Sequence, residues 1–420
     1  MNSNRRNFLK WAGLASAAWS LPKSVSAATT PPHVVVIGGG FGGATAAKYL
    51  KLWGGNIEVT LIDRNASHYA CILSNLVVTG ALPISRIQLG YTNLQSKRGV
   101  SFVQGEALAI DPAAKEVTVQ TGGSRYAYSY DKLVLAPGIE FLNPAGSYNP
   151  DLTPHAWKAG PQTLLLKSQL SAMTKGQTYI LTIPKAPYRC PPGPYERACA
   201  VADYLKRKKS GCKLIVLDEN PAIQAEPINF GNAFNVTYKG ILTYIPGATV
   251  TSVDSPARTI VTAKGTFKGA VLNVIPGQRA GQIITNAGLT NDPTGRWALV
   301  NPLSYASTIY PDIHIIGDSQ GTGQPKSGHM ANSQAKVCAD AIIRAFHGEA
   351  PDPSPVTSSA CFSPITSTTA SWLTASFQYD PATKAMKRVE ASFAEAPRPT
   401  SDGMQQMFFW ADNIFADSFS

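Results

Sequence analysis

A cysteine in a proline-rich turn is the residue whose surroundings most clearly suggest chemistry. The turn reads RCPPGP over residues 189–194, and it joins an apolar strand predicted at 179–183 to a helix predicted at 198–209. A thiol just before a helix N-terminus has its thiolate form stabilised by the helix dipole. Since proline fixes φ, the prolines also hold the sulfur of Cys190 in place. The pattern favours a reactive thiol over a buried structural cysteine.

A glycine turn near the start of the chain has the spacing of a nucleotide site. A buried strand leads into Gly38, Gly40 and Gly43, which follow the G-x-G-x-x-G pattern, and a predicted helix and a second strand come next. The second strand ends at Asp63, followed by Arg64, at the distance from the glycines where a ribose-binding acid belongs. This order of elements predicts a dinucleotide site rather than an isolated glycine-rich turn.

Two further strands indicate which dinucleotide is bound. One, YDKLVLAPG, ends at Gly138, and the other, DIHIIGD, ends at Gly317 and Asp318. Taken alone, they are two buried strands. Together with the glycine turn they resemble segments of the FAD-dependent pyridine nucleotide-disulfide oxidoreductase superfamily. The resemblance implies that FAD is bound and that Asp318 binds its ribityl chain.

Residues 178–218 repeat the order of strand, turn, helix and strand, which predicts a second Rossmann-like unit. In relatives that use NAD(P)H the turn is glycine-rich, because backbone N–H groups must approach the pyrophosphate. Here it contains Pro191, Pro192 and Pro194, which have no N–H to donate. We therefore expect a domain without a working NAD site, in a protein that receives its electrons another way.

Five short strings point to a narrower family. They are RCPPGPYER at 189–197, HAWKAG at 155–160, PGQRAG at 276–281, PKSG at 325–328 and ANSQ at 331–334. They closely resemble the flavoprotein subunit of flavocytochrome c sulfide dehydrogenase, over nearly the whole chain after residue 27. The resemblance implies oxidation of sulfide to polysulfide or elemental sulfur. It also implies a heterodimer in which electrons pass to a separate c-type cytochrome subunit.

The resemblance assigns roles to particular residues. In that family a cysteine holds the flavin through its 8α carbon, and the matching string, YACILSN, implies a covalent FAD at Cys71, with Asn75 beside it. The family's redox disulfide matches Cys190 and Cys361. Glu196 is then a candidate acid or base, although an acid in a first helical turn also complements the helix dipole.

Two later positions are expected beside the flavin. Lys326 precedes a helix predicted at 330–346, whose N-terminus would stabilise negative charge on the flavin ring. Trp410 lies in an aromatic segment, 407–415, that either contacts the flavin or lies on a membrane. Because no basic stripe accompanies these aromatics, we favour the flavin contact. The remaining cysteines are expected to pack as small hydrophobic residues: Cys199, Cys212 and Cys338.

Composition and charge narrow the possible functions. The 420 residues are 44% hydrophobic and 15% charged, which is typical of a globular protein. The formal net charge of +11 favours an acidic partner surface or an anionic substrate. No run of Lys and Arg is interleaved with aromatics, so we predict no nucleic-acid binding. The six cysteines form no C-x-x-C pair, and we expect neither a haem nor a metal site in this chain.

The N-terminal residues have the pattern of an export signal. NRRNFLK at 4–10 is a twin-arginine motif, a short apolar stretch follows at 11–19, and VSA at 25–27 offers small residues for cleavage. A basic amphipathic N-terminus is the alternative. We expect a twin-arginine signal peptide at 1–27 and a periplasmic protein. After it, no stretch reaches the roughly 18 consecutive apolar residues of a transmembrane helix.

The expected fold class is α/β, with two Rossmann-like βαβ domains of the glutathione-reductase type and a C-terminal α+β domain. The FAD-binding domain is expected at 28–142 and 277–347, the second Rossmann-like domain at 143–276, and a flavin–cytochrome interface domain at 348–420. Two alternatives to the sulfide dehydrogenase stay open. One is a sulfide:quinone oxidoreductase, and the other is a non-catalytic flavoprotein that docks a redox partner.

Overall fold

The first parallel sheet forms where the glycine turn predicts it. The computed structural model describes residues 30–420, so the predicted twin-arginine signal lies outside the described residues. Five parallel strands follow the order β20-β9-β1-β2-β5. Their bounds are His33–Ile37 (β1), Glu58–Asp63 (β2), Ser101–Gln104 (β5), Lys132–Leu135 (β9) and Ile313–Ile315 (β20). After His33, the central strand β1 is apolar and buried because both of its faces are covered.

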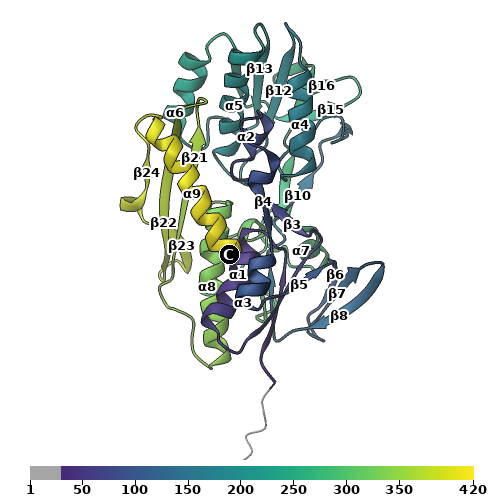
Figure 1. Ribbon diagram of the computed structural model, residues 1–420, viewed down its shortest axis with the longest axis vertical. Helices are drawn as coiled ribbons and strands as arrows, with labels where there is room; N and C mark the ends of the chain where they lie inside the picture. Colours follow the sequence, from purple (N-terminus) through teal and green to yellow (C-terminus); the bar gives the residue numbers. More distant parts are fainter. Residues whose placement is uncertain (1–29) are drawn as a thin grey trace, which may run out of the picture. The chain divides into compact units, whose positions relative to one another are not determined.

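Helices α1 (Phe41–Trp53) and α8 (Gly328–Phe346) pack on each other within this first domain (Figure 1). Helix α8 begins two residues before its predicted start at 330. The Oγ of Ser327 caps α8 by accepting a hydrogen bond from the N–H of Met330 at 3.1 Å. The domain also contains α2 (Ser74–Val78), α3 (Thr92–Arg98), α7 (Gln282–Asn286), the pair β3 (Ser67–Tyr69) and β4 (Gln88–Gly90), and an antiparallel sheet of β6 (Glu106–Asp111), β7 (Glu116–Thr121) and β8 (Ser124–Ser129).

A second parallel sheet repeats the arrangement, in the order β14-β13-β12-β18. Its strands are Thr178–Ile183 (β12), Lys213–Asp218 (β13), Leu242–Pro246 (β14) and Val271–Val274 (β18). Helix α5 (Gly193–Lys208) follows the proline-rich turn and begins earlier than predicted. The same part of the chain holds α4 (Pro161–Ala172), α6 (Pro227–Asn232) and a sheet of β11 (Gly146–Ser147), β15 (Val250–Asp254), β16 (Thr259–Thr262) and β17 (Gly265–Lys268).

A two-stranded antiparallel ribbon, β10 (Ile139–Leu142) with β19 (Gly277–Ala280), connects the two parallel-sheet regions. The predicted boundaries at 142/143 and 276/277 fall at the ends of this ribbon. After residue 348 the chain forms an antiparallel sheet of β21 (Val356–Pro364), β22 (Ala370–Asp380), β23 (Ala385–Arg388) and β24 (Ala394–Glu395), and then α9 (Ser401–Phe419). Strand β21 contacts both α8 and α5.

The expected α/β class, with two Rossmann-like units and a C-terminal antiparallel sheet, is confirmed.

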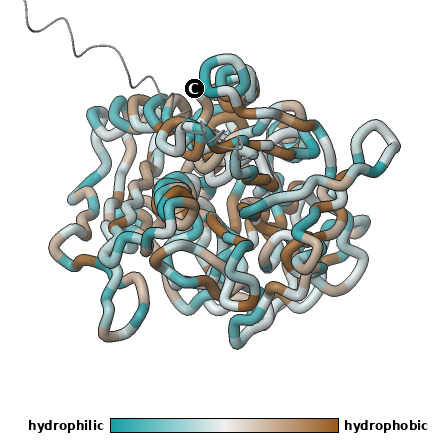
Figure 2. Tube along the Cα trace, turned by 90° about the horizontal axis from the view of Figure 1, so that it is seen from below, coloured by the Kyte–Doolittle hydropathy of each residue, from teal (hydrophilic) through white to brown (hydrophobic). Residues whose placement is uncertain are grey.

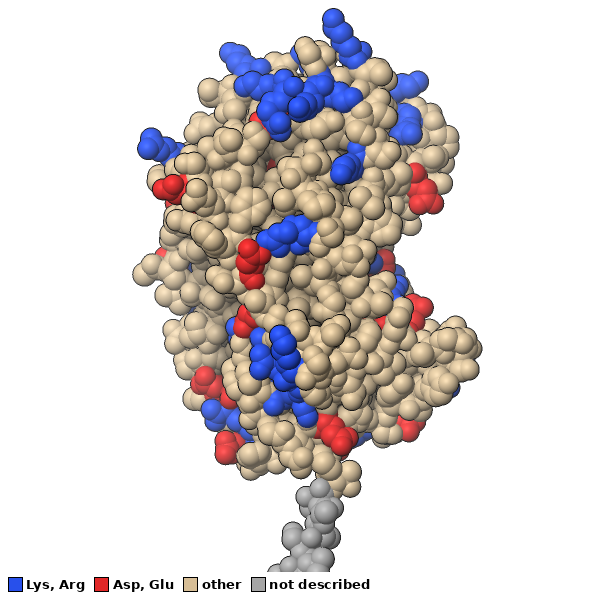
Figure 3. Space-filling model, viewed as in Figure 1, with Lys and Arg blue, Asp and Glu red and all other residues tan. Residues whose placement is uncertain are grey.

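Apolar segments gather in the interior and hydrophilic ones lie outside (Figure 2). Several Lys and Arg side chains gather at the top of the view in Figure 3, over the part of the molecule that holds the second parallel sheet. The last turn of α5 carries Lys206, Arg207 and Lys208. Among residues 30–420, no helix is both long and apolar enough to cross a membrane.

We predict that Asn273→Ala destabilises the second sheet strongly. Asn273 is fully buried on β18; its amide donates to the carbonyls of Pro154 and His155 at 2.7 and 2.9 Å and accepts from Tyr179 at 3.1 Å. Because the substitution strands these buried groups, the free energy of unfolding should fall by about 3 kcal/mol in urea titration. The exposed Asn143→Ala is the control, and an equal loss there would contradict the explanation.

Candidate active site

The glycine turn forms a cradle that only glycine can make. Gly38 has φ +97°, and a Cβ there would lie 2.4 Å from the carbonyl oxygen of Ala136. A Cβ at Gly43 would lie 1.8 Å from the carbonyl oxygen of Gly38. No side chain caps the first turn of α1, whose N-cap is Gly40. The N–H groups of this turn therefore remain available to a phosphate.

A cavity of about 540 Å³ opens beside this cradle. It is lined by Gly38, Gly40, Asp63 and Arg64, as the sequence predicts. The carboxylate of Asp63 accepts a hydrogen bond from the N–H of Gly39 at 2.7 Å, which holds it at the end of β2. Its position fits a ribose-binding acid.

A second cavity, of about 140 Å³, adjoins the first. Residues that line both include Gly40, Cys71, Gly138 and Arg189, so the two form one continuous cleft. The other predicted residues that line the second cavity are Asn75, Cys190, Glu196, Gly317, Asp318, Cys361 and Trp410. Glycines, an acid, thiols and an aromatic from distant parts of the sequence thus meet in one cleft. Gly43 lines neither cavity; its lack of a side chain lets the start of α1 pack against the carbonyl of Gly38.

Lys326 is an exception, because its ammonium does not line either cavity. It is buried, donates to the carbonyls of Asp318 and Gln320 at 2.9 and 2.6 Å, and lies 3.7 Å from the ring centre of Trp297. Its side chain therefore does not line the cleft in which Lys326 was expected beside the flavin. Lys326 holds the loop before α8 instead, and the N-terminus of α8 itself faces the cleft at Ser327.

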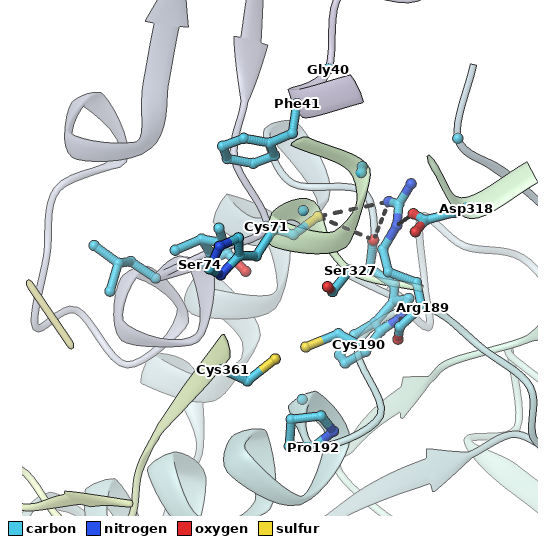
Figure 4. A pocket seen from close by; sticks show the side chains of 18 of the residues that line it. Gly40, Phe41, Cys71, Ser74, Arg189, Cys190, Pro192, Asp318, Ser327 and Cys361 are labelled. Carbon is cyan, nitrogen blue, oxygen red and sulfur yellow. Dashed lines mark hydrogen bonds and ion pairs between the residues drawn. The ribbon is translucent and has the colours of Figure 1, made fainter. Parts of the chain in front are cut away.

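Cys190 and Cys361 come together although 170 residues of chain separate them. Their sulfur atoms point toward each other across the second cavity, and both are free thiols (Figure 4). Cys190 has a left-handed backbone with φ +58°, and its N–H donates to the carbonyl of Lys326 at 2.6 Å. A Cβ at Gly193 would lie 2.8 Å from the sulfur of Cys190, so this turn requires glycine there. The disulfide between the two stays a prediction.

The expectation that the start of α5 stabilises a thiolate at Cys190 is wrong for this geometry. Burial raises the pKa of Cys190 well above its usual range, and the charges of Cys361 and Glu196 add to the rise. A backbone hydrogen bond from Gly193 acts in the opposite direction but is smaller. Burial likewise raises the pKa of Cys361 to about 12. Removal of the sulfur atoms from water outweighs the favourable helix terminus.

Arg189 is a functional candidate that the sequence prediction missed. Its guanidinium donates to the Asp318 carboxylate at 2.6 Å and lies 3.7 Å from the sulfur of Cys71 (Figure 4). The other Asp318 oxygen, Oδ1, is buried without a hydrogen-bond partner in the protein. A hydroxyl of a ribityl chain would satisfy this oxygen, so the residues present fit FAD. No spacing rule identifies Arg189; only its place beside Cys190 could have suggested it.

Glu196 lines the cavity close to the thiols. Burial raises its pKa to about 7, while Asn75 and the charge of Arg197 oppose the rise. Arg197 is itself buried and donates to Asn75 at 2.8 Å and to the carbonyl of Ala156 at 2.6 Å. Glu196 can therefore take up or release a proton near neutral pH.

In the second Rossmann-like unit, the acid at the position that would bind a nucleotide is hydrogen-bonded within the protein. Asp218 ends β13, where a ribose-binding acid would stand, and it is fully buried. Its carboxylate accepts from the hydroxyls of Tyr195 and Tyr244, each at 2.8 Å, and from the N–H of Asn220 at 2.8 Å. These partners leave the acid no free position for a ribose, in agreement with the proline-rich turn.

Helix α9 lies along the cleft rather than away from the protein. The indole N–H of Trp410 donates to Nδ1 of His329 at 3.2 Å, and His329 lines the cavity. Further along the helix, Phe415 and Phe419 pack on Phe41, with ring centres 5.9 and 5.6 Å apart. Most of the aromatic side chains of α9 therefore contact the protein. In residues 30–420 no cluster of three or more potential ligands could hold a metal ion.

Comparison with known proteins agrees with this geometry. Two family models match: the pyridine nucleotide-disulphide oxidoreductases at residues 32–153, and the central domain of the flavoprotein chain of sulfide dehydrogenase (flavocytochrome c) at residues 163–276. The sulfide dehydrogenase flavoprotein chain of Chlorobaculum thiosulfatiphilum is 50% identical over 45 residues, which are 11% of this chain and 94% of that sequence.

Other matches are partial or structural. Ferroptosis suppressor protein 1 of Taeniopygia guttata is 36% identical over 119 residues, and this chain spans only 29% of its length. The crystal structure of the sulfide:quinone oxidoreductase from Aquifex aeolicus has a TM-score of 0.74 at 19% identity, over 92% of each chain, which shows a shared fold. The chain belongs to the pyridine nucleotide-disulphide oxidoreductases with a flavocytochrome c sulfide dehydrogenase central domain, within the sulfide-oxidising flavoprotein family.

Proposed function

We propose that this chain is the flavoprotein subunit of a periplasmic sulfide dehydrogenase. It would oxidise sulfide to polysulfide or elemental sulfur and pass the electrons to a separate c-type cytochrome subunit. The observation that carries the proposal is the meeting of Cys190 and Cys361 in a cavity that continues into the nucleotide cradle. A thiol pair beside a flavin site is suited to two-electron chemistry on sulfur.

The residues of the cleft would hold FAD in two parts. The glycine cradle and Asp63 would hold the adenosine and pyrophosphate half, and Asp318 would hold the ribityl chain. Cys71 lines both cavities and would be the covalent tether. Bound FAD supplies a two-electron acceptor that can release its electrons one at a time.

The thiol pair would react with sulfide by thiol–disulfide exchange. Hydrosulfide attacks one sulfur of the Cys190–Cys361 disulfide, so that a new S–S bond forms as the old one breaks. The electron pair of the broken bond leaves on the other cysteine as a thiolate. Because burial disfavours this thiolate, a nearby group must supply or remove protons, and Glu196 is placed to do so. The N-terminus of α8 favours negative charge in the cavity.

The acceptor distinguishes this proposal from a sulfide:quinone oxidoreductase. The structural likeness to the Aquifex aeolicus protein favours that second candidate. The packing of Phe415 and Phe419 against Phe41 disfavours it, because these side chains are not free to enter a membrane. Since the sequence contains no C-x-x-C-H motif, the haem would lie on the partner subunit. Co-purification with a cytochrome, compared with quinone reduction in detergent, separates the two candidates.

We predict that the flavin is covalently bound through Cys71. After acid precipitation of the protein, the yellow colour should stay in the pellet, whereas Cys71→Ser should release it to the supernatant. Cys212→Ser, at a buried cysteine that does not line the cleft, is the matched control and should keep the colour in the pellet. Colour in the wild-type supernatant would show that the tether is absent.

We predict that NADH is a poor reductant of this protein. The prolines at 191, 192 and 194 offer no N–H groups, and Asp218 is already bonded to two tyrosines. In anaerobic stopped-flow absorbance, sulfide should bleach the flavin on a timescale at which NADH leaves it oxidised. Equal bleaching by both donors would mean that the second unit still binds a nucleotide.

We predict that Cys190 and Cys361 act as one unit. Either single serine substitution leaves no disulfide for sulfide to open, so sulfide-driven flavin reduction should fall by orders of magnitude. The losses should not add in the double variant. The controls Cys199→Ser and Cys338→Ser, both at buried core thiols, should cost only stability, on the order of 1 kcal/mol. A Cys361→Ser protein with near-normal sulfide turnover would refute the disulfide mechanism and leave direct attack of sulfide on the flavin.

A further inference from the structure

Arg189 gives the sulfur of Cys71 a cationic hydrogen-bond partner. Its Nη1 donates to Sγ of Cys71 at 3.7 Å (Figure 4). The same Nη1 donates at 3.3 Å to the carbonyl of Trp157, which also accepts from the Cys71 thiol at 3.6 Å. Among residues 30–420, the other two thiols that line the cleft, those of Cys190 and Cys361, have no hydrogen bond from a charged side chain. The contact therefore distinguishes the tether cysteine from the thiol pair.

The guanidinium is held in this position from several sides. The backbone N–H of Arg189 donates to Oε1 of Gln278 at 2.7 Å, and its carbonyl accepts from the indole N–H of Trp157 at 3.2 Å. Its Nε donates to the carboxylate of Asp318 at 2.6 Å. Gly138 leaves room for the guanidinium, because a Cβ there would lie 2.7 Å from Nη2. The donor that faces the sulfur is therefore fixed.

The guanidinium keeps its charge although only 18% of the side chain is exposed. Burial lowers the pKa of Arg189, but the charges of Asp318 and Cys71, together with the hydrogen bonds to them, raise it above its ordinary value. A cationic N–H stabilises a negatively charged acceptor more than a neutral donor does. Because the thiolate is the nucleophilic form of cysteine, this contact favours the reactive form of Cys71.

The pair lies where a covalent flavin would need a nucleophile, and this inference rests on the covalent FAD of the proposed function. Cys71 and Arg189 both line the cavity beside the glycine cradle and the cavity that holds the thiol pair. The tether sulfur and its cationic donor are thus together at the junction of the two cavities. The chain itself holds both groups that an attachment step requires.

We propose that the chain attaches its own FAD and that Arg189 is the catalytic residue of this step, because it stabilises the Cys71 thiolate. In the balanced reaction a C–H bond of the flavin 8α methyl group breaks and an S–C bond to Cys71 forms. The electron pair stays on the flavin, which is reduced, and the protons of the former S–H and C–H bonds pass to the reduced flavin. The cytochrome of the proposed function, or O₂ in air, then takes the two electrons.

The test adds FAD anaerobically to the full chain, produced without flavin in a riboflavin-starved host. Attached flavin is measured as fluorescence of the protein band in a denaturing gel, and flavin reduction is measured by absorbance. In wild type, attachment and bleaching should rise together with no sulfide present, because FAD is the only oxidant. Attachment without bleaching would overturn the self-catalysed step.

Arg189→Gln removes the cationic donor and should attach FAD about 100-fold more slowly than wild type, although it still binds FAD without a covalent bond. Arg189→Lys keeps the charge without the planar fork of donors and should recover part of the rate. Arg125→Gln, at an exposed arginine that lines neither cavity, is the matched control and should attach FAD at the wild-type rate. A wild-type rate in Arg189→Gln would overturn the role of Arg189.

A second measurement needs no flavin and applies even if Arg189→Gln does not bind FAD. Iodoacetamide alkylates thiolates, and peptide mass spectrometry reports its reaction with Cys71 in the flavin-free chain. Alkylation of Cys71 should be about tenfold slower in Arg189→Gln than in wild type. Arg189→Lys should react at an intermediate rate, and it carries the comparison if Arg189→Gln does not fold. Equal rates in wild type and the variants would overturn the stabilisation of the thiolate.

The same samples separate this inference from the proposed function. Wild type that binds FAD but attaches none would overturn both the tether and the self-catalysed step. After reoxidation in air, sulfide is added anaerobically to the wild-type holoprotein, and bleaching then reports sulfide oxidation. Wild type that attaches FAD and is not bleached by sulfide would contradict the sulfide dehydrogenase and support self-attachment.

Discussion

The 2.6 Å hydrogen bond from the N–H of Cys190 to the carbonyl of Lys326 joins the two halves of the active site. It ties the turn before α5 to the residue before the cap of α8. Cys190 has to adopt a left-handed backbone to make it, at a cost of roughly 1–2 kcal/mol. Gly193, which has no Cβ to meet the sulfur, makes this conformation sterically possible. The bond thus holds the backbone from which the sulfur of Cys190 points toward Cys361.

Burial is the constraint that governs the chemistry of the resulting cleft. It is the largest cause of the raised pKa at Cys190, Cys361 and Glu196, so each of these groups disfavours its charged form. Charges that persist in the cleft are paired, as Arg189 is with Asp318. In this environment a thiolate would need a proton donor or acceptor beside it, and Glu196 lines the same cavity with its pKa raised to about 7.

Much of the fold followed from local patterns, whereas much of the site did not. The glycine spacing predicted the first sheet and its cradle, because backbone sterics impose glycine at these positions. Lys326 was misplaced because sequence order does not show that two carbonyls and a tryptophan ring already satisfy its ammonium. Arg189 was missed because its role comes from a contact with Asp318, which is distant in sequence. Pairing of Cys190 with Cys361 came from a resemblance and not from spacing.

The two parallel sheets explain how one cleft can hold both a nucleotide cradle and a thiol pair. In such sheets ligands bind beyond the carboxyl ends of the strands. The glycine turn follows β1, Asp318 follows β20 and the Cys190 turn follows β12, so all three lie at carboxyl ends. In the second sheet, prolines remove the N–H groups and tyrosines occupy Asp218, yet the strand and helix that position the turn persist. The edge that would have bound a second nucleotide instead fixes the sulfur atom of Cys190.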